Sequence, residues 1–130
     1  MNNLINDVSA EKNIDDFLSM GDVEIKILFS SDNPVLLGKT FQSSVHQITK
    51  EKLHLEVCRK LVLNSVIDMS VYLKNNGKNY CLTGNVRSCN PSDKSNHYKV
   101  AIVFRERQDQ PSDYREWNKG FRKNFKNLIQ

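Results

Sequence analysis

Few residues in the sequence combine the type and the spacing that chemistry at a site requires. His54 and Cys58 are both metal-ligand types, but four residues apart on a strand they would lie roughly 13 Å from each other, too far to share one ion. No serine or cysteine stands beside a recognisable base, and His46, His54 and His97 are expected to be ordinary strand residues. The sequence therefore predicts neither a metal site nor an activated nucleophile.

Acid–base chemistry and nucleotide hydrolysis are disfavoured as well. Glu24, Glu56 and Asp68 take outward positions on three separate expected strands, so no carboxylate pair can be proposed from them. A phosphate-binding loop needs several glycines close together so that backbone amides can approach the phosphate. The five glycines are instead scattered, at Gly21, Gly38, Gly77, Gly84 and Gly120. We expect a non-catalytic protein without a cofactor.

Composition predicts one folded, soluble domain. A chain of 130 residues, 38% hydrophobic and 26% charged, is long enough for one core and too apolar for a disordered chain. No apolar run approaches the roughly 20 residues needed to cross a bilayer, and residues 1–10 lack a secretory signal pattern. Three cysteines without metal-like spacing indicate reduced thiols. We expect a cytoplasmic protein, and the dispersed net charge of +4 does not indicate a nucleic-acid partner.

The two ends of the chain have helical spacing. Apolar residues recur at helix-like intervals within 3–20, and Gly21 stands where a left-handed cap would end that helix. A stripe of apolar residues follows a cap at Ser112 or Asp113, and its members are Tyr114, Trp117, Phe121, Phe125 and Leu128. The first segment is mainly acidic and the last mainly basic. They could pair within one chain or between two, or remain two separate solvated faces.

Between the ends the period changes to two, which is typical of strands with one buried face. The first expected strand begins at Asp22 and buries alternate residues, namely Val23, Ile25, Ile27 and Phe29. Five more follow at 41–45, 53–57, 67–73, 80–86 and 98–104. A turn is expected at 31–34, and Asn75-Asn76-Gly77-Lys78 predicts a hairpin because Asn-Gly tolerates the positive φ angles of a tight primed turn.

Strands joined by short turns, with no helix between them, predict an antiparallel barrel. The expected fold is mainly β: a six-stranded antiparallel barrel with an N-terminal and a C-terminal α-helix. We expect a single domain, with a helical segment at 1–21, the β-barrel at 22–107 and the C-terminal helix at 108–130, packed on or beside the barrel.

From about Gly38 to Phe104 the order of these features resembles a PilZ domain, a family of cyclic di-GMP signalling modules. Residues 41–45 would be the family's first strand, 47–52 its short turn, and Leu53-His54-Leu55 the strand after it. Val100-Ala101-Ile102-Val103-Phe104 has the family's apolar-x-apolar-Phe ending. The resemblance covers roughly half the chain. It implies a PilZ-like barrel and a role in bacterial motility, pilus or surface-attachment regulation.

The ligand-binding positions of the family differ in this chain. Where the family has Asp or Asn, Ser and Gly in the turn, this sequence has Gln47, Thr49 and Lys52. The amide and hydroxyl can still form hydrogen bonds, but they reach different points, and lysine adopts a glycine conformation only at a cost. The family's Arg-x-x-x-Arg clamp is missing, because no arginine precedes Arg59. Binding of cyclic di-GMP in the usual way is therefore not expected.

Our leading hypothesis is a non-catalytic PilZ-like adaptor that binds another protein, or itself, through the outer face of the barrel or the end helices. Trp117, Phe121, Arg122 and Lys126 are the candidate contact residues on the last helix. The alternative for that stripe is a contact with the core of the chain itself, with Trp117 as the anchor.

Three other hypotheses involve a nucleotide or a cofactor. A variant cyclic di-GMP receptor would use Gln47, Thr49, Lys52 and Arg59. An oligonucleotide-binding barrel would combine Lys and Arg with Tyr80, Tyr98 and Phe104, which requires a strand phase other than the one expected. A split-barrel flavin protein shares the strand count but lacks a recognisable flavin motif.

Overall fold

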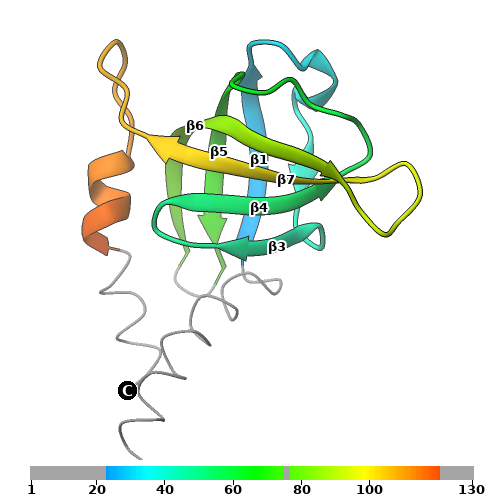
Figure 1. Ribbon diagram of the computed structural model, residues 1–130. Helices are drawn as coiled ribbons and strands as arrows, with labels where there is room; N and C mark the ends of the chain where they lie inside the picture. The colour runs from blue at the N-terminus through cyan, green and yellow to red at the C-terminus, as the bar shows by residue number, and fades with distance from the viewer. Residues whose placement is uncertain (1–22, 75–76, 121–130) are drawn as a thin grey trace, which may run out of the picture.

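Seven strands, all paired antiparallel, form the sheet of the computed structural model, which describes residues 23–74 and 77–120. They are β1 (Val23–Ser30), β2 (Thr40–Phe41), β3 (Val45–Ile48), β4 (Lys52–Val57), β5 (Val66–Leu73), β6 (Lys78–Pro91) and β7 (Tyr98–Arg105), with a 3-10 helix η1 (Pro34–Leu36) after β1. The strand order is β2-β1-β5-β6-β7-β4-β3, and the sheet curls into a nearly closed barrel (Figure 1). The expected mainly β antiparallel barrel is confirmed, whereas the helix expected within 1–21 lies outside the described residues.

The single strand expected at 41–45 is wrong, because two strands occupy this stretch. β2 pairs with β1, and β3 pairs with β4, so the two lie at opposite edges of the sheet. A turn at 42–44 joins them, with the Val45 N–H donating to the Gln42 carbonyl at 3.2 Å. This short link brings the two edges together, which nearly closes the barrel and raises the strand count from the expected six to seven.

Alternate residues of the strands fill the barrel as the two-residue period predicted. The core includes Ile25, Leu53, Met69, Leu82 and Ile102, each exposed by 1% or less. Phe29 is an exception, because the register of β1 against β5 shifts between Ile27 and Phe29. This β-bulge turns Phe29 outward next to Leu28, and each is 48% exposed, so the prediction that Phe29 is buried is wrong.

Gly84 allows β6 and β7 to approach closely in the middle of the sheet. A Cβ at this position would lie 2.5 Å from Cγ2 of Ile102 and 2.9 Å from the carbonyl oxygen of Val103. The glycine is therefore required by packing. At the β5–β6 hairpin, Leu73 pairs with Lys78 and Gly77 has a φ of 71°, as expected for the tight turn, of which residues 75–76 are not described.

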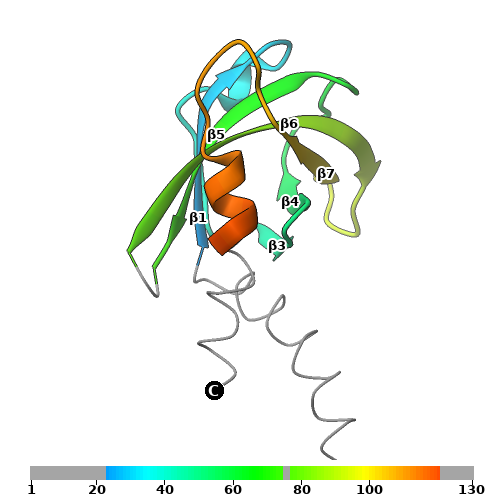
Figure 2. The same ribbon diagram turned by 90° about the vertical axis from the view of Figure 1, so that its left-hand side faces the viewer.

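The C-terminal helix begins at Tyr114 and is described up to residue 120. Figure 2 shows it standing across the opening between β1 and β5 on one side and β3 and β4 on the other. Trp117, on this helix, belongs to the hydrophobic core of the barrel and is 1% exposed. Its ring meets Tyr80 and Phe104 edge-on, at centroid distances of 5.2 and 5.9 Å. The helix therefore completes the core of the barrel.

Candidate functional site

Three of the four residues predicted to bind a nucleotide, Gln47, Thr49 and Lys52, lie in the β3–β4 hairpin. The Thr49 hydroxyl oxygen accepts from the backbone N–H groups of Glu51 and Lys52, at 3.3 and 3.2 Å. The Thr49 N–H in turn donates to the Lys52 carbonyl at 2.8 Å. The hydroxyl thus stabilises the turn itself. Lys52 is exposed, and Gln47 is half-buried on the outer face, where it pairs in register with His54.

Arg59, the fourth predicted ligand, follows the far end of β4. Because β4 runs from Lys52 to Val57 with a rise of about 3.3 Å per residue, about 16 Å of strand separates the Thr49 turn from the loop that carries Arg59. The structure therefore brings Gln47, Thr49 and Lys52 into one hairpin but does not bring Arg59 to them.

The predicted partner-binding residues fall into two groups. Trp117 is buried, and its indole N–H donates to the Lys50 carbonyl at 2.8 Å, which supports the core contact weighed for this stripe. Phe121, Arg122 and Lys126 lie outside the described residues.

The aromatic residues predicted to stack on nucleic-acid bases are mostly buried. Tyr80 and Phe104 pack against Trp117 and present no ring face at the surface, while Tyr98 is half-buried.

Large exposed apolar side chains gather at one end of the barrel. Within 23–74 and 77–120, five of the six exposed large hydrophobics lie there, each 48 to 55% exposed: Leu28, Phe29, Leu37, Val62 and Leu63. Leu28 and Phe29 come from the bulge of β1, Leu37 follows η1, and Val62 and Leu63 belong to the β4–β5 loop, which lies with η1 at the top of Figure 1. We call these five residues the loop-end surface.

Asn33 fixes the two loops of this surface to each other. Its side-chain amide donates to Oγ of Ser65 at 2.8 Å, and its amide oxygen accepts from the Val62 N–H at 3.0 Å. Its own N–H donates to Oγ of Ser30 at 3.1 Å. Asn33 is 5% exposed, so these bonds satisfy a buried amide. Asn33 therefore joins the loop that carries Leu37 to the loop that carries Val62 and Leu63.

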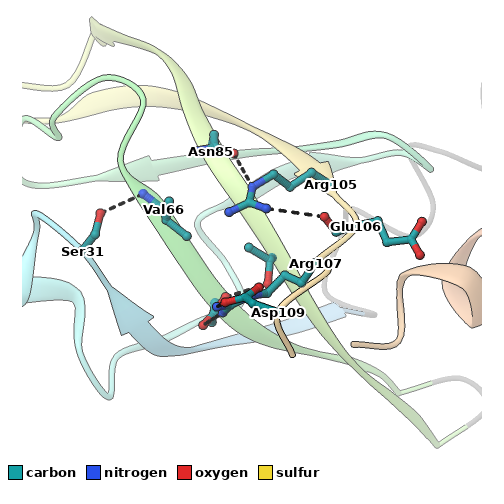
Figure 3. A network of polar contacts seen from close by, with 9 residues as sticks. Ser31, Val66, Asn85, Arg105, Glu106, Arg107 and Asp109 are labelled. Carbon is teal, nitrogen blue, oxygen red and sulfur yellow. Dashed lines mark hydrogen bonds and ion pairs between the residues drawn. The ribbon is translucent and has the colours of Figure 1, made fainter. Parts of the chain in front are cut away.

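A network centred on Arg107 lies beside the loop-end surface. The guanidinium contacts the carboxylate of Asp109 through two nitrogens (Figure 3) and that of Asp68 through a third, at 2.7 Å. Asp68 also accepts from the Thr83 hydroxyl at 2.6 Å. The hydrogen bond to Asp109, followed by the charge of Asp68, raises the pKa of Arg107, and the bond from Arg107 lowers the pKa of Asp109. These residues use their hydrogen-bonding groups on one another, so the network has a structural role.

The Cys81 thiol and groups of metal-ligand side chains are the remaining candidates for chemistry in the described residues. Burial, and then the carboxylates of Asp113 and Asp68, raise the pKa of Cys81, so its thiol is protonated at neutral pH. No group of three or more His, Cys, Asp or Glu residues in 23–74 and 77–120 could hold a metal ion. None of the helices in the same ranges has the length and apolar character to cross a bilayer.

Comparison with protein-family models, with curated proteins and with solved structures finds no match to this chain. The candidate site is therefore defined by its own geometry. Sequence reasoning missed the loop-end surface, because Leu28 and Phe29 belong to an alternating strand and Val62 and Leu63 to an unassigned loop. The run Leu61-Val62-Leu63, three apolar residues outside any predicted strand, was the available signal.

Proposed function

We propose that this chain is a non-catalytic, PilZ-like adaptor module of the cytoplasm that acts by binding another protein through the loop-end surface. The observation that carries the proposal is the set of exposed apolar side chains at one end of the barrel, three of which, Leu37, Val62 and Leu63, lie on two loops joined by Asn33. Single exposed apolar residues are normal on a protein, but a contiguous group of them typically marks an interaction site. The PilZ-like part rests on the layout alone, an antiparallel barrel followed by a C-terminal helix.

The charges around the surface indicate the chemistry of the partner. Exposed ionisable side chains on the two loops are mainly basic, with Lys39, Arg59 and Lys60 against Asp32. A partner that presents apolar side chains bordered by carboxylates would therefore complement both the centre and the rim. In this proposal Arg59 acts at the rim of a protein interface.

The test compares three tagged proteins: the wild type, the double variant Leu37→Asp/Leu63→Asp, and the control Tyr72→Asp. Tyr72 is also exposed but lies on β5, away from the loop-end surface. All three should show the same circular dichroism spectrum, because the substituted side chains are exposed, by 50% for Leu37, 55% for Leu63 and 38% for Tyr72. We expect a protein from the native cell to be captured by the wild type and by Tyr72→Asp, and to be lost with the double variant. Equal capture by all three would contradict the proposal.

A second copy of the chain is a separate possible occupant of this surface. Sedimentation velocity over a range of protein concentrations measures it directly. We expect a monomer at all concentrations. A dimer that is lost in Leu37→Asp/Leu63→Asp but kept in Tyr72→Asp would show that the loop-end surface binds a second copy of the chain and not another protein.

A further inference from the structure

A second surface, away from the loop-end surface, is polar and hollow. It lies on the outer face of β3, β4, β7 and β6, where register pairs Gln47 with His54, His54 with Ala101, and Ala101 with Ser88. The small side chain of Ala101 sits between larger neighbours and leaves a depression of about 440 Å³. This volume falls within the roughly 300–1,000 Å³ typical of small-molecule sites. We call it the polar hollow. Its lining around Ala101 includes Gln47, His54, Ser88, Asn90 and Lys99, together with His46, Leu55 and Val100.

The side chains around the polar hollow have unused hydrogen-bonding capacity. Gln47, His54, Ser88, Asn90 and Lys99 come from four strands, and none of them forms a side-chain hydrogen bond or ion pair with another described residue. This contrasts with the depression beside Arg107, where Asp68, Thr83 and Arg107 bind one another. Converging polar groups that are not consumed by the fold are available to a ligand.

The charge of the polar hollow favours an anion. Lys99 carries three donors and no acceptor, and the two amides and the hydroxyl can also donate. No carboxylate lines the hollow. Glu56 pairs in register with Lys99 on the adjacent strand but forms no ion pair with it, and its two oxygens accept instead from Nε2 of His46 at 3.0 Å and from Oγ of Ser92 at 3.1 Å. A ligand oxygen therefore meets donors from Lys99 and its neighbours.

We propose that the polar hollow binds a small phosphate-bearing ligand, with Lys99 as the charged contact and Gln47, Ser88 and Asn90 as neutral donors. A tetrahedral phosphate presents acceptor oxygens in several directions, which matches donors that arrive from separate strands. A carboxylate presents its two oxygens in one plane and would leave part of this set unused. The site goes beyond the adaptor function and does not depend on it.

The experiment is an NMR titration of the full chain with inorganic phosphate and with adenosine monophosphate, at constant ionic strength and with acetate as the control anion. We expect saturable backbone amide shifts around the polar hollow with a phosphate probe and none with acetate. Tighter binding of the nucleotide would identify an organic phosphate as the ligand class, and equal binding would identify the free ion. No saturable shift, or the same shifts with acetate, would overturn the proposal.

Matched variants test whether phosphate binds at the polar hollow. Lys99→Gln should weaken phosphate binding about tenfold or more, because it removes a charge-assisted hydrogen bond. Lys26→Gln removes the same charge from an outward position on β1 and should leave binding unchanged. Ala101→Leu should block the site by filling its floor, without any change of charge. Equal loss in the two lysine variants would show a general charge effect and would contradict the proposal.

Discussion

The indole N–H of Trp117 donates a 2.8 Å hydrogen bond to the backbone carbonyl of Lys50, 67 positions earlier in the chain. The contact joins the C-terminal helix to the β3–β4 turn, while the same ring packs against Tyr80 and Phe104. The turn that carries Thr49 and the helix after the barrel are therefore parts of one packed unit. The proposed binding module is rigid only if that unit is stable.

Replacement of Trp117 by alanine should reduce the free energy of unfolding by about 3–5 kcal/mol, because it removes the largest fully buried side chain of the described core. Trp117→Phe should cost less, since it retains a ring and loses the indole N–H. Urea unfolding followed by far-UV circular dichroism measures both. Tyr72→Ala, on an exposed ring, is the control. A Trp117→Ala variant as stable as this control would show that the helix does not contribute to the core.

Gly84→Ala should destabilise the barrel by about 1–3 kcal/mol, because the added methyl group would overlap Ile102 and the Val103 carbonyl. Thermal unfolding of the variant should show the loss as a lower melting temperature. Ser88→Ala lies on the same strand, where its hydroxyl forms no hydrogen bond with another described residue, and should change stability little. Equal melting temperatures for the two variants would contradict the close approach of β6 and β7.

His54 should titrate below its ordinary pKa of 6.5. Burial is the main cause of the lowered pKa, followed by the charges of Lys52 and His46, and the groups that face it also include Glu56 and Lys99. NMR of the ring resonances measures the midpoint, and Lys52→Gln should raise the pKa. Because the unfolded chain then binds the proton more readily than the folded one, the contribution of His54 to stability is present above pH 6.5 and is lost as pH falls below it. A midpoint above 6.5 would contradict the assignment.

Cyclic di-GMP should show no tight binding through the positions predicted from the PilZ resemblance. The Thr49 hydroxyl is used within its own turn, and Arg59 follows the opposite end of β4. Isothermal titration calorimetry of the wild type and of Thr49→Ala/Arg59→Gln tests this expectation. Tight, stoichiometric binding that disappears in the double variant would show that these residues form a ligand site after all.

The strands could be predicted from sequence because each buries alternate residues on one face. Ile67, Met69, Val71 and Leu73 illustrate this, since all four are in the core as expected. The failures occur where backbone geometry breaks the period. The bulge after Ile27 exposes Phe29, and the turn at 42–44 divides one apparent strand into the two edge strands of the sheet. The bulge has no signal in the types of the residues involved, and the only signal for the turn is the pair Ser43-Ser44.

The candidate sites could be predicted only in part. Gln47 was singled out, but its neighbours in the polar hollow, Ser88 and Asn90, lie about 40 positions away on a strand whose pairing cannot be read from local spacing. The four-residue separation of His54 and Cys58 predicted that the two do not share a metal ion. It said nothing about His54 and Ala101, which the sheet places side by side. Long-range pairing, rather than motif, determines both surfaces.

The most direct test of the adaptor function is a calorimetric titration of the captured partner, once purified, into the wild type, Leu37→Asp/Leu63→Asp and Tyr72→Asp. We predict saturable binding to the wild type and to Tyr72→Asp, and binding at least tenfold weaker to the double variant, because the apolar centre of the interface is replaced by charge. Equal affinity for all three proteins would contradict the assignment of the loop-end surface as the binding site.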